Sequence, residues 1–168
     1  MKYALGILLF VLVASVEAST IPPAQTISRA ALVVQAGGGQ VLTRCVSFSE
    51  PQISGADLLR RSGLGLETVN DPGLGEFVCR IEQEGCPASD CLCAFPPTYW
   101  RYWLLQADGW QFSAAGATTR MLGDGDGDAW VWSAEDTPPP VIAFDTVCPA
   151  ALPYQAYLPL LRSTSKER

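Results

Sequence analysis

Residues 99–132 decide the fold, and they read YWRYWLLQADGWQFSAAGATTRMLGDGDGDAWVW. All five tryptophans of the chain lie in this stretch. Runs 99–106, 109–113 and 129–133 have the character of strands, and Gly-rich turns separate them. So much aromatic surface on strands joined by turns predicts a sheet whose rings form a core, a wall that faces a ligand, or both.

The run 99–106 is aromatic on both faces, because side chains alternate along a strand. One face carries Trp100, Tyr102 and Leu104, and the other carries Tyr99, Arg101, Trp103 and Leu105. A single short helix cannot cover both faces, so the second face is predicted to be exposed. The candidate ligand-binding residues are therefore Tyr99, Arg101, Trp103 and Trp110. Burial in the core is the alternative for each of these rings.

The rest of the chain adds a hairpin, one helix and two further strands. The predicted strands are 31–36 and 40–48, which flank Gly37-Gly38-Gly39, and then 75–81 and 141–147. Ser54 is predicted to cap a short helix, because Asp57 follows it at the third helical position. One helix on a mixed sheet predicts an α+β domain of the β-grasp type over residues 31–148.

The first 18 residues have the pattern of a secretory signal peptide. Lys2 precedes an apolar run over 4–14, and Val16-Glu17-Ala18 forms a cleavage site before Ser19. This run is shorter than the roughly 20 residues that a membrane span needs. Residues 19–30 are predicted to be an exposed leader, and 149–168 a C-terminal tail. The protein is therefore expected to be secreted or held at the cell surface.

Charge and composition narrow the classes of function. The formal net charge is -6 and the pI is about 4.5, which makes nucleic acid and anionic membranes poor partners. The chain contains no histidine, so it cannot form a Ser-His-Asp or Cys-His catalytic triad by itself. We therefore predict that the protein is not an enzyme. A hydrolase that uses two carboxylates is the weaker alternative.

Six cysteines in an exported chain predict three disulfides. A zinc site is the weaker alternative, because the spacing contains no CxxC pair and the chain has no histidine. Six cysteines allow 15 pairings. We favour a nested arrangement, in which the pairs are Cys45–Cys148, Cys79–Cys93 and Cys86–Cys91.

The run GDGDGD places three carboxylates at alternate positions. Asp124, Asp126 and Asp128 occupy the first, third and fifth positions of an EF-hand-like loop, and Glu135 occupies the twelfth. The strand-like run over 129–132 begins where such a loop should still be turning around its ion. A Gly/Asp turn that leads into a strand is therefore favoured over a calcium site, and no metal site is predicted.

Several of these segments together resemble a known family. They are the helix start at Ser54 with Asp57, the strand 75–81, the YWRYW run at 99–103, Gly116 and the GDAWVW ending at 127–132. This combination resembles the transcobalamin C-terminal-like domain, also called DUF4430, over about residues 31–148. The resemblance implies a β-grasp-like fold and kinship with the domain that covers one face of the corrin ring in vitamin B12 carriers. The Cys-rich run at 79–93 departs from that pattern.

These observations lead to two expectations about function. The first is an exported, non-catalytic binding module, with a corrinoid such as cobalamin, or another flat molecule, as the ligand that the resemblance implies. The second is a structural module of a bacterial surface that contacts a protein or a glycan. A deep pocket lined by aromatic rings would favour the first, and a large flat aromatic patch would favour the second.

Overall fold

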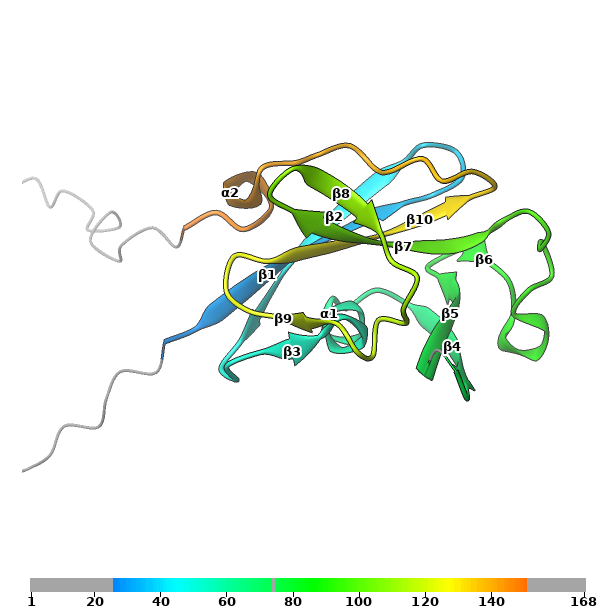
Figure 1. Ribbon diagram of the computed structural model, residues 1–168, viewed down its shortest axis with the longest axis horizontal. Coiled ribbons are helices and arrows are strands. Elements are labelled where there is room, and N and C mark those ends of the chain that lie inside the picture. Colours follow the sequence, from blue (N-terminus) through cyan, green and yellow to red (C-terminus); the bar gives the residue numbers. More distant parts are fainter. Residues whose placement is uncertain (1–25, 74, 151–168) are drawn as a thin grey trace, which may run out of the picture.

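The computed structural model describes residues 26–73 and 75–150, and its centre is a five-stranded sheet. The sheet has the order β2 (Val41–Phe48), β1 (Ser28–Gln35), β10 (Gly127–Ser133), β7 (Tyr99–Gln106) and β8 (Gly109–Phe112) (Figure 1). Only β1 and β10 run parallel, and the other neighbours are antiparallel. A mixed sheet with a parallel central pair and hairpins on both sides is the predicted β-grasp arrangement, and the α+β class is confirmed.

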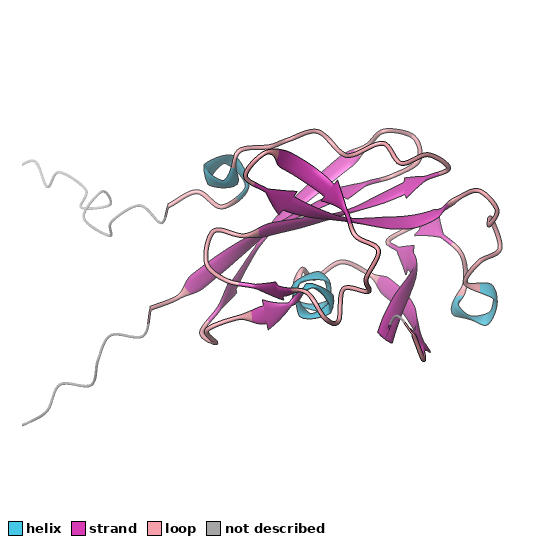
Figure 2. Cartoon of the chain, viewed as in Figure 1, coloured by secondary structure: helices cyan, strands magenta, loops and turns pink. Residues whose placement is uncertain are grey.

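The helix that follows the first hairpin is α1 (Gly55–Arg61), and it packs on one face of the sheet (Figure 2). Ser54 caps it as predicted, because its hydroxyl accepts from the backbone N–H of Asp57. The carboxylate of Asp57 accepts in return from the backbone N–H of Ser54. Arg60 and Arg61 lie in the last turn, where the helix dipole favours positive charge.

Two smaller sheets lie on the same side as α1. One pairs β3 (Ile53–Ser54) with β9 (Met121–Leu122). The other has the order β4 (Leu66–Asp71), β5 (Gly75–Ile81) and β6 (Glu84–Gly85) (Figure 1). Of these strands, only β5 was predicted from the sequence. A 3-10 turn, η1 (Ala88–Asp90), follows β6.

The predicted final strand over 141–147 is wrong. Residues 141–143 have no regular structure, and α2 (Phe144–Val147) is a single helical turn. The segment crosses over the face of the sheet instead of pairing with its edge. Burial of its apolar side chains against that face stabilises this path. Ile142 and Phe144 are partly buried there, and Val147 is buried.

The main core lies between the five-stranded sheet and α1. Trp100 and Tyr102 of β7 point into it together with Trp130 of β10, as the alternation predicts. The rings of Tyr102 and Trp130 lie 4.6 Å apart between centroids. Leu58 and Leu59 of α1 are buried against this layer. The exposed surface of α1 is left to its charged residues.

The opposite face of the sheet is covered by residues 134–148, which we call the cover segment. Beneath it lies a second buried cluster, made of Val33, Trp103, Ala129 and Val131. Partly buried Trp110 and Ile142 pack against this cluster. The prediction that this second face is exposed is therefore wrong. It assumed that only a helix could cover a face of the sheet, whereas an irregular segment covers this one.

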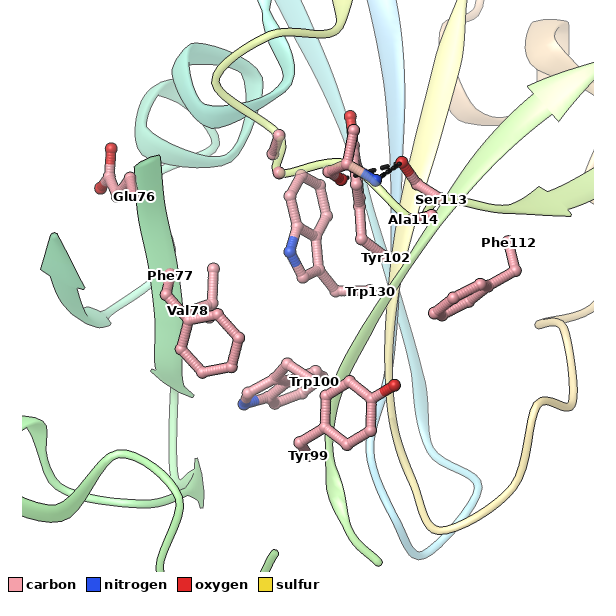
Figure 3. A pocket seen from close by; sticks show the side chains of 13 residues that line it. Glu76, Phe77, Val78, Tyr99, Trp100, Tyr102, Phe112, Ser113, Ala114 and Trp130 are labelled. Carbon is pink, nitrogen blue, oxygen red and sulfur yellow. Dashed lines mark hydrogen bonds between the residues drawn. The ribbon is translucent and has the colours of Figure 1, made fainter. Parts of the chain in front are cut away.

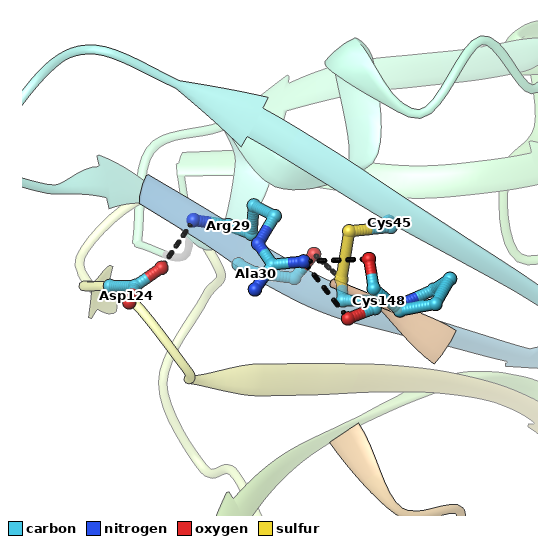
Figure 4. The surroundings of a disulfide bond; sticks show 6 residues. Arg29, Ala30, Cys45, Asp124 and Cys148 are labelled. Atoms are coloured by element: carbon cyan, nitrogen blue, oxygen red, sulfur yellow. Dashed lines mark hydrogen bonds between the residues drawn. A yellow bond between two sulfur atoms is a disulfide. The ribbon is translucent and has the colours of Figure 1, made fainter. Parts of the chain in front are cut away.

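Three disulfides are present, as expected, but two of the predicted pairings are wrong. Cys45–Cys148 is confirmed, and it joins β2 to the end of the cover segment (Figure 4). The other bonds are Cys79–Cys91 and Cys86–Cys93, not Cys79–Cys93 and Cys86–Cys91. The two bonds therefore interleave along the chain. The backbone N–H of Cys86 donates to the carbonyl of Cys79 across the β5–β6 hairpin, so these two half-cystines lie side by side and each takes a separate partner.

Arg29 ties the first strand to the last described residues. Its guanidinium donates to the carbonyls of Cys148, at 3.0 Å, and Pro149, at 2.9 Å (Figure 4). The predicted leader therefore ends earlier than residue 30, since Ser28–Gln35 is already strand β1. The predicted signal peptide lies outside the described residues, and so does the predicted tail beyond residue 150. Within the described part, no helix combines the length and hydropathy required to cross a bilayer.

Candidate functional site: an aromatic pocket between two sheets

Arg101, one of the four predicted ligand-binding residues, holds the cover segment in place. Its side chain is buried, and its guanidinium donates to the carbonyls of Ser133, at 3.2 Å, and Ala134, at 2.9 Å. It also pairs with the carboxylate of Asp136 and lies over the ring of Tyr99, 4.3 Å from the centroid. Because these contacts use most of its donors, the guanidinium stabilises the fold and has few donors left for a ligand.

Trp103 and Trp110 lie beneath the cover segment and do not form a ligand-facing wall. Trp103 is only 5% exposed and meets Phe112 edge-on. Trp110 donates its indole N–H to the carbonyl of Pro140 at 3.3 Å. Of the four predicted site residues, Tyr99 alone borders a cavity on the helix side of the sheet. The structure therefore does not bring the four residues together around a ligand.

A cavity of about 220 Å³ opens instead between β5 and the five-stranded sheet (Figure 3). Three strands of the large sheet, one strand of the small sheet and the loop after β8 contribute to its wall. Its lining residues are Glu76, Phe77, Val78, Tyr99, Trp100, Tyr102, Phe112, Ser113, Ala114, Ala115, Gly116, Ala117 and Trp130.

Aromatic residues are the largest group in this wall. Six of the lining residues are aromatic, and Figure 3 shows Phe77 of β5 opposite Trp100 and Trp130 of the large sheet. Small residues of the loop 113–117 close one end, where Ser113 donates to the carbonyl of Ala115 and the backbone of Ala117 accepts from Ala56. The cavity remains open because the loop 113–117 carries only small side chains, and larger ones would fill the space between the rings.

Sequence reasoning missed Phe77 and the loop 113–117. Strand β5 was predicted, but no signal in the sequence showed that a second sheet would stand across from β7. The alternation along β7 did place Trp100 and Tyr102 on a single face. The signal for a cavity on that face is the length of α1, because a helix of seven residues is too short to cover the face from end to end.

A second cavity of about 200 Å³ lies on the other side of Trp100. Its wall combines apolar residues, such as Val34 and Leu42, with the polar residues Gln40, Glu82, Gln83 and Glu84. The indole N–H of Trp100 is buried and has no acceptor among the described residues. This nitrogen lies close to Gly85, where a Cβ would stand 2.8 Å away from it. Trp100 therefore separates an aromatic cavity from an acidic one.

Behind the aromatic cavity lies a buried polar group. The hydroxyl of Tyr102 donates to the carboxylate of Asp128, which is completely buried. Burial raises the pKa of Asp128 to about 6, although the bond from Tyr102 and the charge of Arg120 act in the opposite direction. Burial beside Asp128 also raises the pKa of Tyr102. Arg120 Nε lies 3.5 Å from Asp128 Oδ1, but the two atoms make no hydrogen bond.

The three aspartates of the GDGDGD run have separate partners. Asp124 accepts from the backbone N–H of Arg29 at 2.7 Å, and Asp126 accepts from that of Gly123 at 2.8 Å. Asp128 faces Tyr102 in the core. No cluster of three or more metal-ligating residues occurs in residues 26–73 and 75–150. The run is a turn that leads into β10, and it fixes the start of β1 beside it.

Comparison with known proteins finds only distant structural likeness. No protein-family model matches the sequence, and a search of curated proteins finds no match. A crystal structure of a "putative metal binding protein" from Ruminococcus gnavus ATCC 29149 is 15% identical with a TM-score of 0.44 and covers 63% of this chain and 96% of its own. Haptocorrin in complex with Cbi is 14% identical with a TM-score of 0.46, and the match covers 68% of this chain and 27% of haptocorrin. At these scores neither neighbour informs the function of this chain.

Proposed function

We propose that the protein is an exported, non-catalytic binding module whose ligand places a ring-sized apolar group in the aromatic pocket. The observation that carries this proposal is that Phe77 of β5 faces Trp100, Tyr102 and Trp130 of the large sheet across one cavity of about 220 Å³. This volume is below the roughly 300–1,000 Å³ of sites for drug-sized ligands, so the pocket takes one group of a molecule. Three disulfides are consistent with an oxidising, extracellular setting.

A non-catalytic role fits the chemistry of the groups that could react. The chain has no histidine. Among the residues that the structure describes, the one carboxylate with a strongly raised pKa, that of Asp128, is held between Tyr102 and Arg120 in the core. Glu76 borders the pocket but is paired with Arg60 at 3.0 Å. A ligand should therefore be recovered chemically unchanged after long incubation with the protein.

A corrinoid is the ligand that the resemblance to transcobalamin C-terminal-like domains implies. The pocket would hold an edge group of such a molecule, and most of the ring would remain in solvent. Because little of the ligand surface is then buried, we expect affinity no tighter than micromolar for cobalamin. Stacking on Trp103 plays no part in this proposal, since the cover segment occupies that face.

Tryptophan fluorescence provides the test, because Trp100 and Trp130 line the pocket. Benzyl alcohol, as a neutral ring probe, and cobalamin, with correction for its absorption, are titrated into the disulfide-bonded protein. We expect saturable quenching that Phe77→Ala weakens, with Phe144→Ala on the opposite face as the control. Calorimetry checks each result. The proposal fails if none of the titrated molecules shows saturable binding.

A second candidate function is contact with another protein through the loop 86–97. Two disulfides hold this loop, and it leaves Leu92 46% exposed and Phe95 52% exposed. Apolar side chains on a preorganised loop bind a partner with a low entropy cost. Leu92→Ser combined with Phe95→Ser should abolish capture of a surface partner and leave the fluorescence titrations unchanged.

A further inference from the structure

The lining of the aromatic pocket carries negative charge and no positive charge. Glu76 is its only charged residue, and no lysine or arginine contributes to the wall. The hydroxyl of Tyr102 is engaged by Asp128, and that of Ser113 by the carbonyl of Ala115. An anion would therefore find no cationic partner in this pocket. A sugar would find few free polar side chains to recognise its hydroxyls.

Aromatic faces attract positive charge, because the ring quadrupole places negative potential above and below the plane. Phe77, Trp100 and Trp130 supply such rings from both sides of the cavity (Figure 3). The ring of Tyr99 already packs against the guanidinium of Arg101, so it is not counted among these rings. The net charge of -6 adds a favourable long-range field for cations.

We propose that the group bound in this pocket is an organic ammonium, such as the trimethylammonium head of choline, an inference that rests on the proposed function. The rings of Phe77, Trp100 and Trp130 supply most of the attraction. Glu76 contributes less, because Arg60 neutralises much of its charge at 3.0 Å. The apolar methyl groups of the ligand would replace water against the rings.

The test compares choline with 3,3-dimethyl-1-butanol, the uncharged molecule of the same shape. Both are titrated by tryptophan fluorescence and calorimetry into the disulfide-bonded protein, at constant ionic strength. A cation enclosed by aromatic rings should gain about tenfold in affinity over its neutral counterpart. Equal or tighter binding of the neutral molecule would overturn the inference, and so would the lack of saturable choline binding.

Three variants assign the effect to the pocket. Phe77→Leu keeps the apolar volume but removes a ring, so it should reduce the preference for choline several-fold and change binding of the neutral molecule less than about twofold. Glu76→Gln should weaken choline only about two- to fivefold. Phe144→Leu makes the same change as Phe77→Leu on the opposite face of the sheet, and it should have no effect.

Benzyl alcohol separates the two proposals. If it binds and Phe77→Ala weakens it, while choline shows no preference over its neutral counterpart, the cation inference is wrong and the binding module stands. If neither choline nor the neutral probes show saturable binding, both proposals fail. Preferential binding of choline that Phe77→Leu reduces supports both.

Discussion

Tyr102 donates its hydroxyl hydrogen to the buried carboxylate of Asp128, directly beneath Gly55, the first residue of α1. A Cβ on Gly55 would stand 2.2 Å from Tyr102 Oη and 3.0 Å from Asp128 Oδ2. The absence of a side chain at this one position lets the helix approach the polar pair and seal it from water. Fold stability and its pH dependence both follow from this contact.

Asp128 should give the protein a measurable pH dependence of stability. Its pKa is about 6 in the folded protein, against an ordinary value of 3.8, so the folded state binds the proton more tightly than the unfolded state. The resulting stabilisation is fully present below about pH 4 and is lost as the pH rises through about 6, by up to about 3 kcal/mol. Asp128→Asn should remove this component, as measured by urea unfolding from pH 4 to 8.

The effect of Asp128 is the difference in unfolding free energy between the wild-type protein and Asp128→Asn at each pH. Between pH 4 and 7 the free energy of unfolding of Asp128→Asn should rise relative to that of the wild-type protein. Above pH 7 the difference between the two proteins should stay constant. Asp57 and Glu50 have lowered pKa values, so their contributions begin to be lost as the pH falls below about 5. This loss is the same in both proteins and cancels in the difference. Parallel curves over the whole range would show that Asp128 does not carry the effect.

Gly55→Ala should destabilise the fold by about 1–3 kcal/mol, because the added methyl group must displace Tyr102 or the helix. Combining it with Tyr102→Phe removes the hydroxyl that the methyl group would meet, so the two changes should be less than additive. Gly38→Ala is the matched control, since a Cβ there meets nothing within 4 Å. Thermal and urea unfolding of the four variants measure these losses, and fully additive effects in the double variant would contradict the prediction.

Removing Cys45–Cys148 should be the most damaging loss of a disulfide. This bond closes a loop with a sequence separation of 103, against 12 and 7 for the other two. Cys45→Ala with Cys148→Ala should lower the free energy of unfolding by about 2–5 kcal/mol, and more than Cys86→Ala with Cys93→Ala does. An equal or larger loss in the second variant would contradict this ranking. Non-reducing peptide maps should show Cys79 linked to Cys91.

Arg101→Lys should weaken the attachment of the cover segment. A lysine has one donor group where the guanidinium reaches the carbonyls of Ser133 and Ala134 together with Asp136. We expect a loss of about 1–3 kcal/mol in unfolding free energy. Affinity for pocket ligands should change little. A loss of ligand binding with unchanged stability would return Arg101 to the ligand site.

Local pattern predicted the central sheet well. The alternation and turns of 99–106 and 109–113, the glycine loop of the first hairpin, and the Ser54 cap each act within a few residues, and each appears in the structure. Strand β4 was missed because Leu66–Asp71 is polar and only partly buried, so it lacks the alternation of a half-buried strand. Its pairing depends on β5, which follows it along the chain.

The site could not be predicted in the same way, because it depends on what covers each face of the sheet. The strand 99–106 has two aromatic faces, and sequence reasoning assigned the helix to one and solvent to the other. The cover segment has no periodic pattern, and its fit on Trp103 and Val131 is a tertiary property. The disulfide pairing in 79–93 was missed for a similar reason, since the β5–β6 hairpin decides which cysteines adjoin.

The parallel pairing of β1 with β10 has a consequence for how the chain folds. Ala31 lies beside Gly127, so the two middle strands cannot meet until most of the polypeptide has been synthesised. Contacts between such distant segments slow folding, because the intervening loop must close first. An emerging chain would therefore stay open through most of its synthesis, with its cysteines accessible, and would complete its fold late.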